Sequence, residues 1–254
     1  MRAANRLVAD VLQALAAMVA PGVTTKELDA VAERRIAEAG AVPAFKGYRG
    51  FPATLCASVN AEVVHGIPSD RRLNAGDILS LDMGVRMAGF YGDSAVTVPV
   101  GPVTERTREL LTVTEEALEH AIDQVRVGGR VSDLGHAVQQ HVERHGFSVV
   151  RECVGHGIGA ALHEEPQIPN YGAPGRGPRL AEGMVLAIEP MVTMGKAAVK
   201  VLSDGWTAVT RDGSLAAHFE HTVAVTSDGP RVLTRRDAVD PVGSVAGERA
   251  RGRE

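Results

Sequence analysis

The chain has 254 residues, 44% of them hydrophobic and 23% charged, and a formal net charge of −4. This balance is typical of a globular protein with a large core, and it gives no support for a nucleic-acid-binding or anionic-membrane surface. The two cysteines, Cys56 and Cys153, are too few for a disulfide framework or a cysteine-rich zinc module. We therefore expect a protein of the reducing cytoplasm, with neither nucleic acid nor a membrane as its partner.

Helical patterns occupy both parts of the chain. Residues 1–22 are apolar at helical spacing but interrupted by polar residues, so they predict an amphipathic helix rather than a signal peptide or a membrane span. A capping box of Thr24 and Glu27 then starts a second helix, which Gly40 ends. Two further helices are predicted, at 104–126 and 132–145.

The segment that begins at Gly22 resembles the segment that begins 106 residues later. This shift places Gly22 on Gly128 and Gly40 on Gly146, and apolar positions of the helix between them coincide as well. The pattern indicates an internal duplication, or else a chance alignment of two amphipathic helices.

Strand-like runs cluster after the helix pairs. They lie at 54–59, 77–87, 90–98, 147–154, 184–193, 198–202, 206–210 and 215–226. Clustered strands of this kind predict an α+β fold with antiparallel sheets, and Asp204-Gly205 marks a hairpin between two of the runs. We expect one domain over residues 1–233 and a disordered tail over 234–254, where the sequence is small, polar and charged.

Acidic residues occupy positions that should belong to the core. Asp82 and Asp93 lie within the apolar runs of LDMGVRMAGFYGDSAV, and a tight turn midway between them would place them opposite each other on one face. Glu189 and Glu220 lie within two further apolar runs. Burial of four carboxylates is costly unless cations compensate their charge.

Histidines beside glycines extend this pattern. His65 lies in NAEVVHGIP, and His156 and His163 lie in VGHGIGAALHEEP. Two aspartates, two glutamates and one histidine carry a formal charge that two divalent cations neutralise. Such donors suit Mn, Fe(II), Co or Zn better than Ca, and paired ions of this kind serve in hydrolysis. The residues therefore predict a two-metal site.

Five separated motifs, in this order, resemble one enzyme family: SVNAEVVHGIP, LDMGVRMAGFYGDSA, GHGIGAALHEEP, AIEPMV and FEHTVAVT. Through them, residues 5–233 are similar to the type I methionine aminopeptidases, which have the pita-bread fold. The resemblance implies two pseudo-symmetric halves around a curved antiparallel sheet, with helices outside. It also implies a metal-dependent hydrolase that removes the N-terminal methionine from peptides and nascent proteins, with a preference for a small second residue.

The resemblance also implies roles for individual residues. The implied metal ligands are Asp82, Asp93, His156, Glu189 and Glu220, with Asp93 and Glu220 bridging the two ions. A bridging water or hydroxide would attack the first peptide bond, and Glu189 would accept its proton. His163 would hydrogen-bond the carbonyl oxygen, and His65 would contact the nitrogen side of the scissile amide.

The same comparison implies an apolar pocket for the methionine side chain. By position, its walls would be Tyr48, Phe51, Cys56 and Trp206. The chain departs from the family pattern beside this pocket, at Phe45, Arg49 and Leu162, and these departures leave the side-chain preference open. The implied partners are N-terminal methionyl peptides and nascent chains, and the expected state is a monomer; the sequence leaves contact with the ribosome open.

Three other functions fit parts of the sequence. A prolidase-like enzyme would share the fold, although such relatives usually carry an additional N-terminal domain. A non-catalytic binding module would have lost metal ligands, whereas this chain keeps every implied ligand. A serine hydrolase built on Ser94 would need a strand-to-helix elbow, but Ser94 lies within a strand-like run.

The remaining histidines have less specific surroundings. His120, His136, His141 and His145 lie on predicted helices, where a surface position is favoured over a second metal site. His221 follows Glu220, so its side chain should face the opposite side of that strand.

Overall fold

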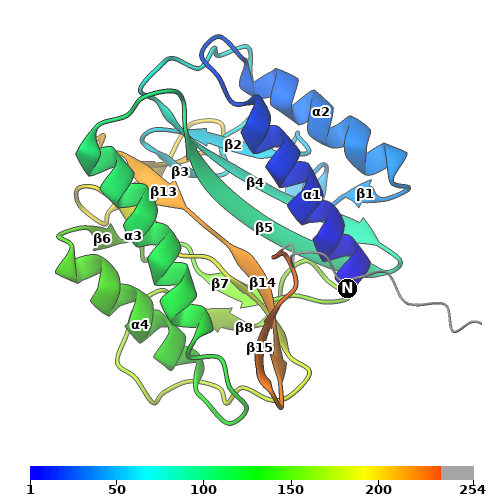
Figure 1. Cartoon of the computed structure of the whole chain (residues 1–254), viewed down its shortest axis with the longest axis vertical. Helices are drawn as coiled ribbons and strands as arrows, with labels where there is room; N and C mark the ends of the chain where they lie inside the picture. The colour runs from blue at the N-terminus through cyan, green and yellow to red at the C-terminus, as the bar shows by residue number, and fades with distance from the viewer. Residues whose placement is uncertain (236–254) are drawn as a thin grey trace, which may run out of the picture.

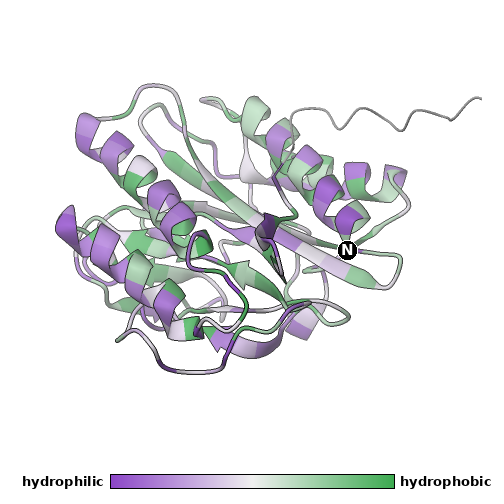
Figure 2. Cartoon of the chain, turned by 60° about the horizontal axis from the view of Figure 1, so that its bottom comes forward, coloured by the Kyte–Doolittle hydropathy of each residue, from purple (hydrophilic) through white to green (hydrophobic). Residues whose placement is uncertain are grey.

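The computed structural model describes residues 1–235. Helices pack in two pairs on one side of the strands (Figure 1): α1 (Arg2–Met18) beside α2 (Thr25–Glu38), and α3 (Glu105–Ile122) beside α4 (Val131–Arg144). Figure 2 shows hydrophilic and hydrophobic residues alternating along each helix, as expected for helices with one face on a core. No helix in this range is long and apolar enough to cross a membrane.

The first half consists of α1, α2 and a sheet beneath them. Its strands are β1 (Val42–Pro43), β2 (Cys56–Val59), β4 (Ile78–Met87) and β5 (Phe90–Pro99), in the order β1-β4-β2 with β5 paired to β4. The helices cover this sheet with their apolar faces, so that Val8, Leu15, Leu28 and Ile36 are fully buried in one core with Leu81. This core explains the helical spacing of the apolar residues.

The second half repeats the arrangement beneath α3 and α4. One sheet has the order β15-β14-β9-β7-β8, and its strands are β15 (Gly229–Val232), β14 (His221–Thr226), β9 (Val185–Ile188), β7 (Gly155–Gly157) and β8 (Glu164–Ile168). Beside it lie β13 (Ala216–His218), β10 (Met191–Thr193) and β6 (Ser148–Val149). A third group consists of β11 (Val199–Val201), β12 (Ala208–Thr210) and β3 (Glu62–Val64), and it confirms the hairpin predicted at Asp204-Gly205.

The two halves correspond at the 106-residue shift. Helix α2 spans 25–38 and α4 spans 131–144, so both ends shift by the same amount. Gly40 and Gly146, which follow them, have left-handed φ values of 67° and 71°, a conformation that glycine adopts without steric cost. The structural match favours duplication over a chance alignment.

Strand β5 joins the two halves. Ala95 forms an antiparallel bridge with Glu220. Ser94 Oγ donates to the Glu220 carbonyl at 2.6 Å, and Thr222 Oγ1 donates to the Asp93 carbonyl at 2.7 Å. These hydroxyls are buried, and they satisfy backbone oxygens that would otherwise cost about 1–3 kcal/mol each. The backbone that carries Asp93 and Glu220 is therefore held from both sides.

The hairpin of β4 and β5 differs from its predicted register. Asp82 pairs with Ala95, and Asp93 pairs with Gly84, so the direct opposition of the two aspartates is wrong. The reason is the turn, which lies at Ala88 and Gly89 rather than midway between the aspartates. A shift of the strand pairing by two residues keeps each side chain on its original face of the sheet. Both carboxylates therefore still lie on the same side, diagonally across the two strands.

Two predicted strands are interrupted at their acidic residues. The run at 184–193 divides into β9 and β10 around Glu189 and Pro190, and the run at 215–226 divides into β13 and β14 before His221. Pro190 lacks an N–H group and so cannot donate a hydrogen bond to a neighbouring strand. In both runs, the strand before the break and the strand after it belong to different sheets. The predicted strand at 147–154 is reduced to β6, and the segment after His163 forms β8, which was not predicted.

The first residue of the predicted tail, Thr234, packs against the folded part of the chain, and the domain boundary at residue 233 stays a prediction. Thr234 is buried, and its Oγ1 lies 2.8 Å from Nδ1 of His221. The predicted tail from residue 236 onward falls outside the described residues.

A close approach between α4 and the chain at residues 169–171 depends on Gly135. A Cβ at this position would overlap the Pro169 carbonyl oxygen and lie 2.8 Å from the Tyr171 nitrogen. We expect Gly135→Ala to lower the free energy of unfolding by roughly 1–3 kcal/mol in urea denaturation, despite the higher helix propensity of alanine. Gln140→Ala, on the exposed side of the same helix, should change it by less than about 0.5 kcal/mol. Equal stability of the two variants would contradict this close approach.

Candidate active site

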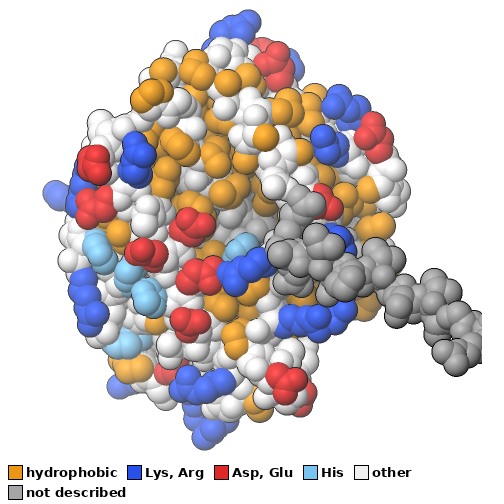
Figure 3. Space-filling view, viewed as in Figure 1, with side chains coloured by type: hydrophobic (Ala, Val, Ile, Leu, Met, Phe, Trp, Pro, Cys, Tyr) orange, Lys and Arg blue, Asp and Glu red, His pale blue; other side chains and the backbone are white. Residues whose placement is uncertain are grey.

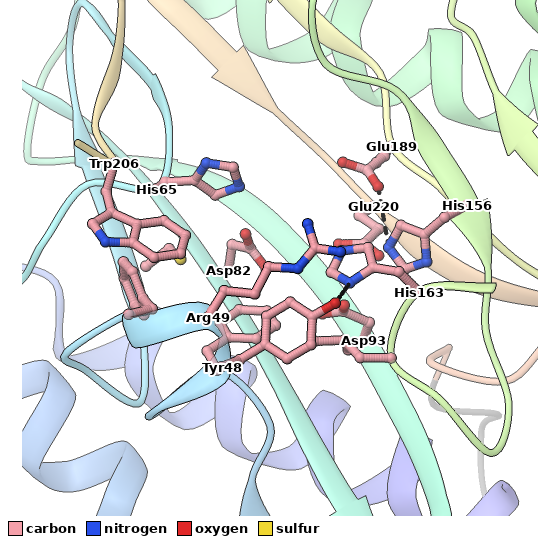
Figure 4. Close-up of a pocket in the computed structure, with 14 residues that line it drawn as sticks. Tyr48, Arg49, His65, Asp82, Asp93, His156, His163, Glu189, Trp206 and Glu220 are labelled. Atoms are coloured by element: carbon pink, nitrogen blue, oxygen red, sulfur yellow. Dashed lines mark hydrogen bonds and ion pairs between the residues drawn. The ribbon is translucent and has the colours of Figure 1, made fainter. Parts of the chain in front are cut away.

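A cavity of about 170 Å³ lies where the two halves meet (Figure 4). It brings together every residue that the sequence singles out for metal, catalysis or substrate: Tyr48, Phe51, Cys56, His65, Asp82, Asp93, His156, His163, Glu189, Trp206 and Glu220. The three positions that depart from the family pattern, Phe45, Arg49 and Leu162, complete the lining.

Four carboxyl groups face this cavity. Oδ1 of Asp82, Oδ1 of Asp93 and Oε1 of Glu220 are buried without a hydrogen-bond partner in the described part of the chain. Burial raises the pKa of all four groups, that of Asp93 to about 7, and nearby carboxylates raise the pKa of Asp82, Glu189 and Glu220 further. These are the properties of ligands that exchange protons for metal ions.

His156 completes the set of candidate ligands. Its Nδ1 donates to the Gly157 carbonyl at 2.9 Å, which leaves the lone pair of Nε2 available, and burial lowers its pKa. Nε2 lies 3.5 Å from Oε1 of Glu189. One donor atom each of Asp93, His156 and Glu220 lie within 4.8 Å of one another. Carboxylate and imidazole donors at this spacing fit a borderline divalent ion.

His163 lies next to His156, with ring centroids 4.2 Å apart. Its Nδ1 lies 2.9 Å from the Tyr48 hydroxyl, and the two rings stack with centroids 5.2 Å apart (Figure 4). Burial, followed by the nearby His156 and Arg49, lowers the pKa of His163 to about 4, so the ring is neutral. With the Tyr48 hydroxyl as donor, the ring proton lies on Nε2 and can be donated to a substrate oxygen.

His65 has a strained backbone. Its φ is 60°, in the left-handed region that non-glycine residues rarely adopt and that costs about 1–3 kcal/mol. Its ring is open to the cavity but otherwise surrounded by protein, which lowers its pKa, and its centroid lies 6.3 Å from that of Trp206. Strain of this kind clusters at functional sites, where the surrounding structure holds one geometry.

The apolar wall of the cavity is formed by Phe51, Cys56 and Trp206. The rings of Phe51 and Trp206 meet edge to face with centroids 5.2 Å apart. Cys56 is buried, and burial raises the pKa of its thiol well above the usual range. The thiol therefore remains neutral and acts as a small apolar surface rather than a nucleophile.

Arg49 lies at the edge of the cavity in a short 3-10 turn (Tyr48–Gly50), with φ at 50°. Its guanidinium carbon lies 5.4 Å from the centroid of the Tyr48 ring. No other lysine or arginine of the described chain lines the cavity.

The sequence reasoning missed His218, which lies behind the carboxylates. It is 1% exposed, and its Nε2 lies 3.7 Å from Oε2 of Glu189. Neither ring nitrogen has a hydrogen-bond partner within residues 1–235, and burial lowers the pKa of the ring to about 3. Its position two residues before Glu220, on the same face of an extended segment, is the signal that could have identified it.

Comparisons with known proteins agree with this geometry. Metallopeptidase family M24 matches residues 1–227. Methionine aminopeptidase 1 of Bacillus subtilis (strain 168) is 54% identical over 235 residues, which cover 92% of this chain and 95% of that protein. The crystal structure of methionine aminopeptidase from Thermotoga maritima superposes with a TM-score of 0.92 at 48% identity, covering 93% of this chain and 95% of the other.

A more distant structure shares the fold alone. Prolidase from Pyrococcus furiosus has a TM-score of 0.76 at 24% identity, and the match covers 93% of this chain but 63% of the prolidase. The predicted α+β pita-bread fold is confirmed by these structures. Because the family model and the relatives both match over nearly the whole length, the chain belongs to metallopeptidase family M24, in the group of the methionine aminopeptidases.

Proposed function

We propose that this chain is a metal-dependent aminopeptidase that removes the N-terminal methionine from peptides and nascent proteins whose second residue is small. One observation carries this proposal: a single cavity joins a cluster of carboxylates and imidazoles to an apolar wall formed by Phe51, Cys56 and Trp206. The polar side suits hydrolysis of a peptide bond, and the apolar side suits an unbranched thioether.

The proposed metal site would hold two divalent ions, with Mn, Fe(II), Co and Zn as candidates. Its ligands would be Asp82, Asp93, His156, Glu189 and Glu220, and Asp93 and Glu220 would each be shared by both ions. When bound, such ions lower the pKa of water and polarise the substrate carbonyl. The buried carboxylate oxygens of Asp82, Asp93 and Glu220 support this assignment because no residue in the range 1–235 donates a hydrogen bond to them.

The other polar residues would bind the substrate and move protons. Nε2 of His163 would donate to the oxygen of the first peptide carbonyl, held in that orientation by Tyr48. Glu189 would take the proton of the attacking water and pass it to the leaving amine. His65 would contact the nitrogen side of the scissile amide, from the strained position described above.

Substrate selection would depend on the apolar wall together with the residues that depart from the family. Trp206 and Phe51 would enclose the methionine side chain. Arg49, Phe45 and Leu162 would narrow or charge the entrance to the cavity. We place the enzyme in the cytoplasm as a monomer, where it meets nascent chains at the ribosome.

Anaerobic reconstitution tests the proposed activity directly. Metal-free protein loaded in turn with Mn, Fe(II), Co and Zn should release methionine from Met-Ala-Ser, and it should lose this activity when a chelator removes the metal. An X-Pro peptide is the matched comparison, since prolidases share the fold. Cleavage of X-Pro without cleavage of Met-Ala-Ser would replace the proposed activity with that of a prolidase.

Single substitutions should separate ligands from substrate contacts. Asp93→Asn should remove bound metal and activity together, because one shared carboxylate is lost. His163→Ala should retain the metal but lower turnover by roughly 10²–10³-fold, the scale for losing one oxyanion donor. Metal content by elemental analysis and turnover on Met-Ala-Ser check both expectations. If His163→Ala lost as much metal as Asp93→Asn, the division of roles would be wrong.

Metal binding should release protons. In the metal-free protein, the four carboxyl groups have raised pKa values, while the His163 and His218 rings are already neutral between about pH 5 and 7.5. Affinity for Mn²⁺ should therefore rise across this range. Calorimetry in two buffers of different ionisation enthalpy should detect the released protons, and identical heats in both buffers would contradict the expectation.

Stability should follow the same linkage. The pKa of Asp93 is about 7 when folded, against an ordinary value of 3.8, so between these values the folded state binds the extra proton. Its contribution to the stability of the metal-free protein falls as the pH rises from about 4 to about 7. Metal ions that replace this proton remove the loss of stability that occurs as the pH rises. The difference in Tm between metal-loaded and metal-free protein should therefore be larger at about pH 7.5 than at about pH 5. A constant difference would contradict this linkage.

A further inference from the structure

Histidine side chains gather on the outer face of the α3–α4 pair. His120 comes from α3, and His141 and His145 come from α4. Figure 3 shows histidines grouped over these helices, next to acidic side chains. None of the three lines the cavity described above. Their helical surface positions were predicted, but the way the two helices pack brings them together.

The rings of these three histidines lie in two close pairs. The ring centroid of His141 lies 4.5 Å from that of His120 and 4.7 Å from that of His145. Two imidazoles that bind one ion through Zn–N bonds of 2.0–2.1 Å have centroids roughly 5 Å apart. His141 is therefore the common member of two pairs, each close to the required separation.

Glu116 adds a carboxylate to the group. Its Oε2 lies 3.0 Å from Nε2 of His141. Nε2 of His141 donates a hydrogen bond to this carboxylate. Donor atoms bound to one ion at 2.0–2.2 Å lie roughly 3–3.5 Å apart, so an ion can replace the shared proton with little movement of the two side chains. Glu116 and His120 are four residues apart on α3, as His141 and His145 are on α4, and residues at this spacing share one helix face.

The hydrogen bond of His145 and the lowered pKa of His141 also suit metal ligands. Nδ1 of His145 donates to the His141 carbonyl at 2.9 Å, which leaves the lone pair of its Nε2 free to bind. Burial and then the neighbouring His120 lower the pKa of His141, against the effect of Glu116. A neutral ring is the form that binds metal.

The exposure of His120 and His145 allows their rings to reorient toward a bound ion. His120 and His145 are exposed, whereas the side chain of His141 is 16% exposed. Exposed side chains change rotamer within nanoseconds, so the two outer rings can turn toward an ion held by His141 and Glu116. Half-buried His141 forms the centre of the group, and the exposed side chains around it, Glu116 included, complete it.

We propose that Glu116, His120, His141 and His145 form a second metal site, on the surface, for a divalent transition ion such as Zn²⁺. Three imidazoles and one carboxylate are the donors that such ions prefer. This site is separate from the cavity, and the proposal does not rest on the peptidase function.

Zinc binding to the full chain tests the proposal. Equilibrium dialysis against Zn²⁺, with metal counted by elemental analysis, would compare the unaltered chain with His141→Gln/His145→Gln. His136→Gln is the matched control, since His136 lies on the same helix but contacts the Gly172 carbonyl instead. The unaltered chain and the control should bind one more equivalent of Zn²⁺ than the double variant, in which affinity for this ion should fall by more than about tenfold.

A single variant on α3 tests whether both helices contribute. His120→Gln should also weaken the additional equivalent, while circular dichroism and Met-Ala-Ser turnover with Mn²⁺ remain unchanged in all variants. Equal zinc binding by the double variant and the unaltered chain would overturn the proposal. An effect of the double variant without any effect of His120→Gln would overturn the four-ligand site in favour of a pair on α4.

Discussion

Four carboxyl groups in one cavity, three of them buried and Glu189 half-buried, are the constraint on which the rest of the site depends. Among the described residues that line the cavity, Arg49 is the only lysine or arginine, so the protein compensates little of the negative charge itself. The hydrogen bonds of Ser94 and Thr222 hold the backbone of Asp93 and Glu220, so these groups cannot separate to relieve their repulsion. The proposed divalent cations would compensate this negative charge, because each carboxylate would then face a positive charge.

The candidate ligands could be recognised in the sequence because each one breaks a local rule. Asp82 and Asp93 stand among residues that are otherwise buried, and such conflicts mark functional sites. His218 breaks no such rule: in the sequence only its spacing of two residues from Glu220 points to it, and its closeness to Glu189 depends on the fold. The strand breaks around Glu189 were missed for a related reason: they arise where neighbouring strands join different sheets, a long-range contact.

The carboxylates of the cavity and its apolar wall differ in whether their positions repeat between the two halves of the chain. Strand β4 begins at Ile78 and β9 at Val185, and Asp82 and Glu189 are separated by the same 107 residues. Asp93 and Glu220 are 127 residues apart, and the difference corresponds to the insertion of the β11–β12 hairpin. That insertion carries Trp206. The carboxylates thus follow the repeat, whereas Trp206, which completes the apolar wall, comes from a segment that only the second half possesses.

The division of the proposed ligands between the two halves has a thermodynamic consequence. Each half has its own hydrophobic core, and neither core alone presents the full set of donors. An ion therefore contributes its binding free energy only when both cores are folded and docked against each other. Without an ion, the two halves could unfold one after the other. Metal binding couples them, so that they unfold in a single cooperative transition.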